Sequence, residues 1–261
     1  MKLSIITVNY NDEKGLERTI KSIISQSIHD FEFIVIDGGS TDGSVDVIKK
    51  YESHINYWVS EPDGGIYQGM NKGLYQAKGD YVNFMNSGDC YHAPNVLEQI
   101  FSLGTDADII TGTHVGSPHP NIGKDGITMY ALCTGAVDHQ ASFIKRDVAL
   151  RHPYDEKYRI VSDWKFFIEA LIMDNCSFFY TDTLVVDVDM TGISNTDYSL
   201  NNREREAVLK ELFPERILKD YKLLMSIHPD LLKVAPQITK SQSIRKVVVK
   251  LANVLLKFKS A

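Results

Sequence analysis

The chain has 261 residues, 43% of them apolar and 24% charged, which is ordinary for a soluble globular protein with a substantial core. Its formal net charge of −6 implies no chain-wide basic surface, so we expect no nucleic-acid partner. The three cysteines are widely spaced and form no C-x-x-C pair, so the sequence indicates neither a zinc site nor a disulfide framework.

The first apolar run, Leu3 to Val8, reaches polar residues at once. It is too short for the apolar core and cleavage site of a signal peptide, and no other run approaches the length of a membrane span. Together with the unpaired cysteines, this favours a cytoplasmic protein.

Strand and helix signals alternate along the first half of the chain. Short apolar runs predict five strands, at Leu3 to Val8, Phe33 to Ile36, Tyr57 to Ser60, Tyr81 to Met85 and Ala107 to Thr111. Helical spacing of apolar residues predicts helices after Asn11 or Asp12, after Asp42, from Gly65 to Ala77 and from Pro94 to Leu103. Three glycines weaken the third helix. This alternation predicts an α/β fold with a doubly wound, mostly parallel sheet.

The second half is less regular. Residues 116–126 are expected to form a loop, Ala141 to Ile144 a short strand, and Ser162 or Asp163 the start of a helix. Another strand is predicted at Leu184 to Val188. Residues 197–225 are expected to be largely helical, interrupted by Pro214.

Small polar residues with an aspartate among them follow three of the predicted strands. These segments are Asp37-Gly38-Gly39-Ser40-Thr41-Asp42-Gly43, Glu61-Pro62-Asp63-Gly64-Gly65 and Asn86-Ser87-Gly88-Asp89. In an open α/β sheet the carboxyl ends of the strands face one crevice, where ligands bind. Carboxylates gathered there suit a base, a ribose and a divalent cation, so the pattern indicates a sugar-nucleotide site.

These segments also support a resemblance. Together with Ile5-Ile6-Thr7-Val8-Asn9-Tyr10-Asn11, Ile66-Tyr67, Met70-Asn71-Lys72-Gly73, Asp138-His139-Gln140 and Ser162-Asp163-Trp164, they resemble family 2 of the inverting glycosyltransferases, which has the GT-A fold. The motifs occur in consistent order over roughly residues 1 to 200, which is more specific than any single motif. The resemblance implies a nucleotide-binding N-terminal half followed by C-terminal helices.

The resemblance assigns roles residue by residue. It implies nucleotide binding by Val8, Asn9, Tyr10, Asp37, Asp63, Asn71, Ser87 and Gly88. Asp37 would accept a hydrogen bond from a ring N–H of the base. Asp89 matches the last aspartate of the Asp-x-Asp motif, which ligates Mg²⁺ or Mn²⁺ at the diphosphate. The sequence departs from this motif because Asn86-Ser87-Gly88-Asp89 has one carboxylate, and Gln68-Gly69 replaces a frequent Asp-Ala pair.

Asp163 matches the general base of the family. It would deprotonate the acceptor hydroxyl while the nucleoside diphosphate leaves from the opposite face, which inverts the anomeric configuration. His139, Gln140 and Trp164 would line the acceptor or diphosphate side. The implied activity moves a hexosyl or N-acetylhexosaminyl group from a nucleoside-diphosphate sugar, with UDP expected, to a glycan or polyprenyl-diphosphate-linked saccharide in surface polysaccharide biosynthesis.

Each assignment has a structural alternative when the residue is considered alone. Asp42 favours a helix cap, Asp37 suits a turn, and Asp89 suits a cap near Pro94. Asp163 lies in the first turn of a predicted helix, where acidic residues are favoured electrostatically. His139 alone is typical of a hydrogen-bonded structural histidine.

The C-terminal segment, residues 226–261, is expected to form a basic amphipathic tail beyond a main domain at 1–225. Apolar residues on one predicted helical face are Ile244, Val247, Val248, Leu251, Leu255 and Phe258, with Lys246, Lys250, Asn253 and Lys257 opposite. From Lys240 onward there are six basic residues and no acidic one. This pattern suits an anionic membrane surface, and equally a helix that packs on its own domain or on a second subunit.

Two other functions remain open at this point. A sugar nucleotidyltransferase shares a related fold but should carry a glycine-rich loop with a basic residue near the N-terminus, and Val8 to Asp12 has neither. A non-catalytic nucleotide-sugar-binding protein agrees with the single carboxylate of the metal motif, whereas Asp163 in its expected place argues for an enzyme.

Overall fold

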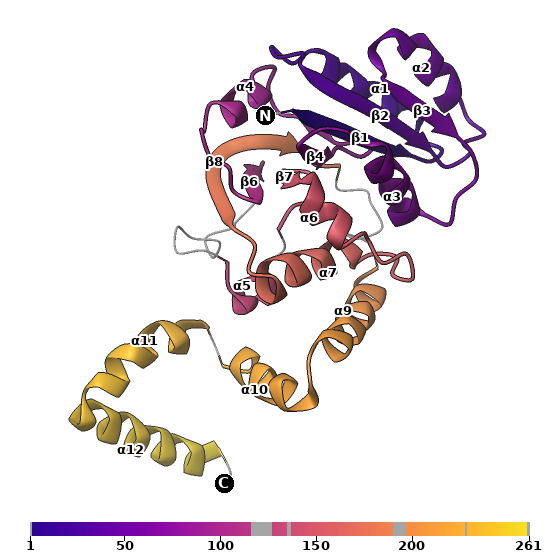
Figure 1. Cartoon of the computed structure of the whole chain (residues 1–261). Coiled ribbons are helices and arrows are strands. Elements are labelled where there is room, and N and C mark those ends of the chain that lie inside the picture. The colour runs from indigo at the N-terminus through magenta and orange to yellow at the C-terminus, as the bar shows by residue number, and fades with distance from the viewer. Residues whose placement is uncertain (1, 116–126, 135–136, 190–196, 228, 260–261) are drawn as a thin grey trace. The chain divides into compact units, whose positions relative to one another are not determined.

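The computed structural model describes residues 2–115, 127–134, 137–189, 197–227 and 229–259 (Figure 1). The predicted loop at 116–126 lies outside these ranges. The chain divides into two compact units, Met1–Glu206 and Ala207–Ala261. The expected boundary at residue 225 stays a prediction.

The first half of the larger unit has the predicted alternation. Its elements are β1 (Leu3–Asn9), α1 (Glu13–Ile24), β2 (Phe31–Asp37), α2 (Ser44–Lys50), β3 (Tyr57–Ser60), α3 (Ile66–Gln76) and β4 (Tyr81–Phe84), with a short 3-10 turn at Glu52–His54. Asp12 caps α1 by accepting a hydrogen bond from the N–H of Gly15 at 2.9 Å. The four strands and three helices predicted here are therefore confirmed.

The second half contains elements that the pattern did not predict. The elements are β5 (Cys90–Tyr91), α4 (Val96–Phe101), β6 (Ile109–His114), α5 (Met129–Thr134), β7 (Ser142–Lys145), α6 (Arg146–Arg151), α7 (Ser162–Ile168), a π-helical turn (Glu169–Met173), β8 (Phe178–Asp187) and α9 (Tyr198–Leu212). The strand β5 and the helices α5 and α6 were not expected. The strand β8 begins six residues earlier than predicted. The prediction missed this start because polar residues between 180 and 183 interrupt the apolar run of a partly exposed strand.

One eight-stranded sheet, in the order β3-β2-β1-β4-β7-β6-β8-β5, organises this unit. Six strands point the same way, while β7 and β5 pair antiparallel with their neighbours. The sheet is thus mixed but mostly parallel, as expected. Because β7 runs against β4, with Val82 opposite Ile144, its amino end lies at the edge where β1, β2 and β4 end. The segment that enters β7 therefore reaches the crevice at this edge.

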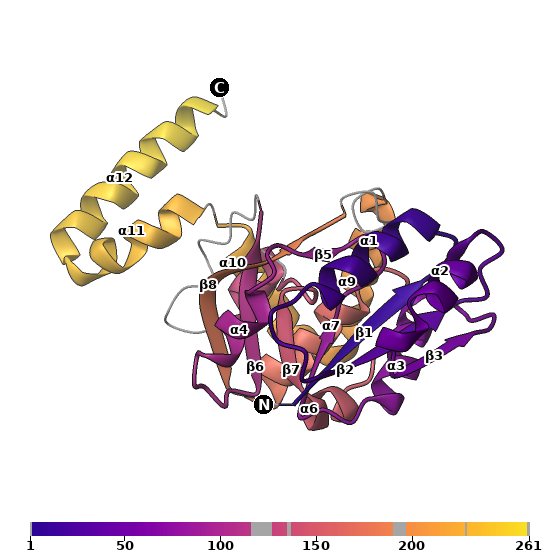
Figure 2. The same cartoon turned by 90° about the horizontal axis from the view of Figure 1, so that it is seen from above.

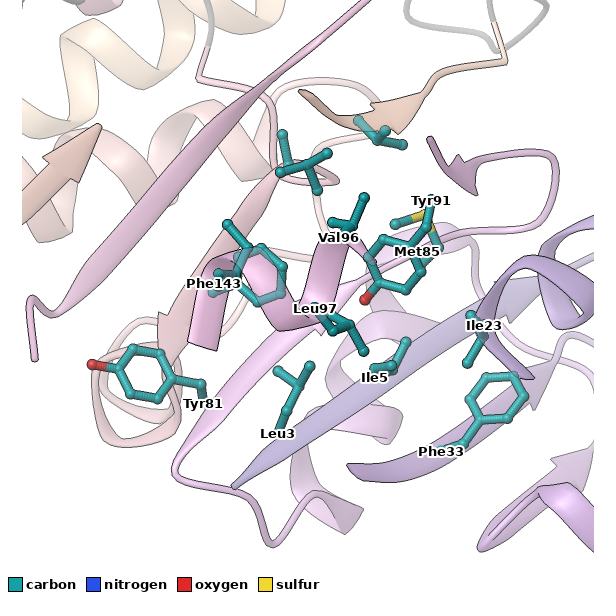
Figure 3. Packing of buried hydrophobic residues seen from close by; sticks show 14 of the residues in the cluster. Leu3, Ile5, Ile23, Phe33, Tyr81, Met85, Tyr91, Val96, Leu97 and Phe143 are labelled. Carbon is teal, nitrogen blue, oxygen red and sulfur yellow. The ribbon is translucent and has the colours of Figure 1, made fainter. Parts of the chain in front are cut away.

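The two faces of the sheet are covered by different helices (Figures 1 and 2). Alternate residues of β1 point to opposite faces. Leu3 and Ile5 pack in one buried cluster with apolar residues of α1, α2 and α4. Figure 3 shows part of this cluster, which also includes Phe33 of β2 and Phe143 of β7.

Helix α3 lies on the opposite face, closely packed against β1. A Cβ atom on Gly69 would lie 2.6 Å from Cγ1 of Val8, and one on Gly73 would lie 2.3 Å from Cγ2 of Ile6. The glycines that weaken the helical propensity of this segment therefore allow its backbone to approach the strand. Helix α3 brings the preceding loop to the carboxyl ends of β1 and β2.

The smaller unit contains α10 (Glu215–Met225), α11 (Pro229–Lys240) and α12 (Gln242–Lys259). Among its described side chains, Leu231, Ile244, Val247 and Leu251 are each more than half exposed. In the parts of the chain that can be described, no helix combines the length and apolar character that crossing a bilayer demands.

Candidate functional site

Asp37 ends β2 and forms the centre of a polar cluster between three strands. Its carboxylate accepts hydrogen bonds from Nδ2 of Asn9 (2.7 Å) and from Oγ of Ser60 (2.6 Å), the last residues of β1 and β3. Ser40 donates from both its backbone N–H (2.9 Å) and its Oγ (2.6 Å). Asp37 has no exposed surface. The residue expected to bind the base thus also ties three strand ends together.

The hydrogen bonds of this cluster decide the charge state of Asp37. Burial alone would raise the pKa of its carboxyl group. The donors from Ser40, Ser60 and Asn9 outweigh burial and lower the pKa below its ordinary value. Asp37 is therefore a stably ionised group at neutral pH.

The loop between β3 and α3 brings a second carboxylate to the same edge. An added Cβ atom on Gly38 would lie 3.1 Å from Oδ2 of Asp63, and one on Gly69 would lie 3.4 Å from it. Asp63 therefore lies directly over the strand-end loop that follows Asp37. The backbone of the first loop lies here too: Val8 is nearly buried, while the side chain of Tyr10 is 67% exposed. Val8, Asp37 and Asp63 thus lie at the same edge of the sheet, and the nucleotide-binding role expected for them and for Tyr10 stays a prediction.

Asn71 is engaged elsewhere. It is buried in α3, where its Nδ2 donates to the carbonyl of Tyr154 (2.8 Å) and to Oε1 of Glu156 (3.0 Å). Its Oδ1 accepts from the N–H of Tyr154 at 2.9 Å. In this structure the side chain holds the 154–156 segment, so its expected role at the nucleotide stays a prediction.

The segment after β4 forms a tight loop over the crevice. Gly88 has φ +98°, which favours glycine, and a Cβ atom there would lie 2.8 Å from Oδ2 of Asp189. Both the backbone conformation and the close side chain therefore require glycine. Ser87 donates to Oδ2 of Asp12 at 3.1 Å. Arg18 donates to the carbonyl of Gly88 at 2.6 Å and pairs with Asp189 at 3.2 Å.

Asp89 differs from Asp37 in its surroundings. It is 5% exposed, and Oδ1 accepts a hydrogen bond from the backbone N–H of Asp189 at 2.8 Å. Burial raises the pKa of Asp89 to about 6, although the side chain of Gln140 and the charge of His139 act against this rise. Asp89 is therefore a buried carboxylate whose negative charge is poorly compensated.

Asp163 lies in the first turn of α7, and both of its carboxylate oxygens have a hydrogen-bond partner. Nδ1 of His139 lies 3.0 Å from Oδ2, and the hydroxyl of Tyr67 lies 3.0 Å from Oδ1. On the far side of the imidazole, Nε2 of His139 lies 3.3 Å from Nδ2 of Asn86. A continuous polar chain thus joins Tyr67, Asp163, His139 and Asn86, and it ends three residues before Asp89.

Charge within this chain favours an ionised Asp163. Burial alone would raise the pKa of Asp163, but the hydrogen bond and positive charge of His139 and the hydroxyl of Tyr67 lower it. Burial likewise acts to lower the pKa of His139, and Asp163 raises it overall. A partly buried carboxylate that remains ionised and has free lone pairs can act as a general base.

Trp164 and Gln140 follow Asp163 and His139 directly in the sequence. Trp164 is 4% exposed, and its Nε1 donates to the carbonyl of Leu132 at 2.7 Å, with the guanidinium of Arg205 4.6 Å from the ring centre. It supports α7 from within the core. The side chain of Gln140, by contrast, acts to lower the pKa of Asp89 against the effect of burial.

Several residues of the site were not predicted from the sequence. Ser40 and Ser60 donate to Asp37, Tyr67 contacts Asp163, and Asp189 contacts Asp89. Tyr67 lies inside a motif that marked the resemblance, which gave it no role. Asp189 follows the predicted strand at Leu184 to Val188, so its place at a strand end was the available signal.

The residues near Asp89 fit a hard divalent cation in type. Asn86 has a buried Oδ1 with no hydrogen-bond partner in the described part of the chain, and Asp89 offers a poorly compensated carboxylate. Both are oxygen donors, which Mg²⁺ and Mn²⁺ prefer. No cluster of three or more His, Cys, Asp or Glu side chains suited to a metal occurs among the residues described.

Comparison with known proteins gives the family. Residues 4–124 match Glycosyl transferase family 2. An uncharacterized glycosyltransferase of Mycobacterium tuberculosis is 33% identical over 224 residues, which cover 80% of this chain and 81% of that protein.

Solved structures show the same fold. TarS residues 1–349 of S. aureus, in complex with UDP-GlcNAc, match 76% of this chain and 62% of that one, with a TM-score of 0.62 and 19% identity. A mannosyltransferase of Pyrobaculum calidifontis, in complex with GDP-Man and Mn²⁺, matches 97% of this chain and 80% of that one, with a TM-score of 0.62 and 16% identity. The chain therefore belongs to glycosyltransferase family 2, and it is an enzyme that transfers a sugar from a nucleotide sugar.

Proposed function

We propose that this enzyme is an inverting transferase that moves a sugar from a nucleoside-diphosphate sugar to a saccharide hydroxyl, with Asp163 as the general base. The observation that carries this proposal is the polar chain from Tyr67 through Asp163 and His139 to Asn86. It connects an ionised carboxylate with the loop that bears Asp89, which supports a general base and a diphosphate site at the same sheet edge.

In the proposed reaction the acceptor oxygen attacks the anomeric carbon as Asp163 takes its proton. The bond between that carbon and the diphosphate oxygen breaks, and its electron pair leaves with the nucleoside diphosphate. Attack opposite the leaving group inverts the configuration without a covalent intermediate, for which one carboxylate is enough. A Mg²⁺ or Mn²⁺ ion at Asp89 and Oδ1 of Asn86 would neutralise charge on the diphosphate.

The donor half of the site has its own residues. Asp37, Asp63 and the first loop at Val8, Asn9 and Tyr10 would hold the nucleoside, and Ser87 and Gly88 would face the diphosphate. The TarS complex contains UDP-GlcNAc and the mannosyltransferase complex contains GDP-Man. We favour a UDP-sugar as donor, and a glycan or polyprenyl-diphosphate-linked saccharide of a surface polysaccharide as acceptor.

Calorimetry with UDP, GDP, dTDP and CDP, with and without Mn²⁺, tests the donor site. We expect one nucleotide to bind, and Mn²⁺ to tighten its binding. Asp89→Ala should remove the effect of Mn²⁺, whereas Asp182→Ala, at an exposed carboxylate of β8, should leave it unchanged. Equal binding with and without Mn²⁺ would contradict the role of Asp89.

Release of nucleoside diphosphate from the sugar donor tests the base. Asp163→Asn should lower turnover about 10²- to 10⁴-fold, the range for loss of a general base, while donor affinity stays within about twofold. Asp182→Asn is the matched control. Turnover that survives in Asp163→Asn would refute the mechanism.

The smaller unit supports a second part of the proposal, which is contact with an anionic membrane surface at the inner face of the cytoplasmic membrane. Ile244, Val247, Val248 and Leu251 recur at helical spacing on α12 and are all exposed. The segment from Lys240 onward has six basic residues and no acidic one, although the whole chain has a net charge of −6. Apolar and basic side chains together suit anionic headgroups, which would place the enzyme near a lipid-linked acceptor.

Flotation with vesicles tests this contact. The full-length protein should float with phosphatidylglycerol vesicles and not with phosphatidylcholine vesicles, and high salt should release it. Lys246→Glu/Lys250→Glu should remain unbound, whereas Lys49→Glu/Lys78→Glu, the same charge change on the larger unit, should float. Unbound wild-type protein with twice the monomer mass by light scattering would instead indicate that α12 pairs with a second copy.

A further inference from the structure

The hydroxyl group of Tyr67 lies between two acceptors. Its oxygen is 2.6 Å from the carbonyl oxygen of Ile160 and 3.0 Å from Oδ1 of Asp163. Tyr67 belongs to α3, and the two acceptors flank the start of α7, so the contact joins elements distant in sequence. A phenol has one hydrogen, so the two acceptors compete for it.

The second oxygen of Asp163 has a different partner. Oδ2 faces Nδ1 of His139 at 3.0 Å, where the donor hydrogen is fixed in the plane of the ring. A hydroxyl hydrogen instead rotates about the C–O bond, so Tyr67 can change acceptor without moving its ring. The two oxygens of Asp163 are therefore held by one fixed donor and one donor that can turn.

We propose that Tyr67 is a positioning residue that serves both protonation states of Asp163. It donates to Oδ1 while the carboxylate is ionised, and its hydrogen turns to the carbonyl of Ile160 once Asp163 has taken the proton of the acceptor hydroxyl. The proposal rests on the proposed function, because it requires Asp163 to be the base. Only the hydroxyl hydrogen of Tyr67 moves, and the carboxyl group keeps its orientation through the proton transfer.

The surroundings of Tyr67 agree with this role. The side chain is 6% exposed, and burial, followed by the negative charge of Asp163, raises its pKa well above the ordinary value. It therefore remains a donor at any working pH. The titratable groups facing Asp163 are Tyr67 from α3, His139 from the segment before β7, and Tyr154 from the segment before α7.

The chain offers a matched control. Tyr154 is 5% exposed, its ring lies 5.5 Å from that of Tyr67, and its hydroxyl has no hydrogen-bond partner among the described residues. Tyr67→Phe and Tyr154→Phe each remove one buried hydroxyl from the same aromatic cluster. Only the first removes a donor to Asp163.

A titration that needs no substrate separates the variants. The ¹³C carboxyl resonance of Asp163, assigned by its absence in Asp163→Asn, reports when this group ionises. Tyr67→Phe should shift the midpoint upward by roughly half a pH unit or more, because the ionised form loses a donor. Tyr154→Phe should leave the midpoint near the wild-type value. Equal midpoints in Tyr67→Phe and wild type would overturn the proposal.

Turnover provides the second measurement, with release of nucleoside diphosphate from UDP-GlcNAc, UDP-glucose and GDP-mannose as the assay. Tyr67→Phe should lower kcat roughly ten- to hundredfold with KM for the donor within about twofold, and Tyr154→Phe should match wild type. Equal losses in the two variants would indicate a merely structural role and overturn the proposal.

Asp163→Asn in the same assay separates the proposal that Asp163 is the general base from the proposal that Tyr67 positions it. If it turns over like wild type, the base assignment and the role of Tyr67 fail together. If Asp163→Asn is inactive while Tyr67→Phe is fully active, only the role of Tyr67 fails.

Discussion

Two buried carboxylates at the same sheet edge are built in opposite ways. Asp37 accepts four hydrogen bonds from three neighbouring residues, and its pKa lies below the ordinary value. The carboxylate of Asp89 accepts a hydrogen bond from the backbone N–H of Asp189, and burial raises its pKa to about 6. Hydrogen-bond donors of the protein compensate the charge of the first carboxylate, whereas the proposed cation would compensate the charge of the second.

The largest effect on stability is expected at Asp37, where hydrogen-bond donors of the protein stabilise the charge of the carboxylate. Asp37→Ala leaves buried donors of Asn9, Ser40 and Ser60 without an acceptor, which should lower the free energy of unfolding by about 3–5 kcal/mol. Urea denaturation measures this loss. Asp42→Ala is the control, because Asp42 is exposed and accepts from the N–H groups of Glu13 and Ser44 at 2.9 Å. The free energy of unfolding of Asp42→Ala should fall by only about 1 kcal/mol. Equal losses in the two variants would contradict the idea that the buried hydrogen bonds of Asp37 matter more than an exposed cap.

A smaller change in the free energy of unfolding, of opposite sign, is expected when Asp89 is replaced. Asp89→Asn keeps an oxygen for the N–H of Asp189 and removes the buried charge, so metal-free protein in EDTA should become more stable by about 1–3 kcal/mol at pH 8. Thermal unfolding should show a higher Tm than wild type, with Asp182→Asn as the surface control. A lower Tm would mean that the ionised carboxylate is already compensated without metal.

The smallest effect is a difference in pH dependence. The folded pKa of Asp89 is raised from 3.8 to about 6, so its contribution to stability is present below pH 3.8 and lost as the pH rises through 6. The pKa of Asp37 is lowered, so its contribution is present above the ordinary pKa of 3.8 and lost as the pH falls through the lower folded value. In EDTA, the stability of wild type relative to Asp89→Asn should fall between about pH 4 and 6, the interval between the unfolded and folded pKa values. A constant difference would reject the raised pKa.

Much of the part of the site around Asp37 could be predicted from local sequence. Short apolar runs that end in Asp37 and Ser60 are sufficient to predict strands whose ends meet, and the structure confirms this meeting. The glycines at 69 and 73 were expected to weaken a helix because propensity is a local property, whereas their close approach to Val8 and Ile6 depends on the folded chain.

The other half of the site depends on distant contacts. His139 and Asp163 are 24 residues apart, and Tyr67 and Asp163 are 96 apart. No periodicity indicates such pairs, so only the resemblance singled out His139 and Asp163, and nothing singled out the hydroxyl of Tyr67. The prediction of β8 began too late because Thr181, Asp182 and Thr183 interrupt its apolar residues.

The reversed direction of β7 determines how much change in length the site tolerates. Val82 opposite Ile144 is one of only two pairs that align β4 with β7, and the crevice side chains of residues 139 and 140 follow directly from that alignment. Sliding β7 by a single position would exchange inward and outward side chains and separate His139 from Asp163. We therefore expect insertions or deletions between β4 and β7 to preserve catalysis only if they leave the segment from residue 138 to β7 unchanged. Tolerated changes in loop length should lie upstream of residue 138.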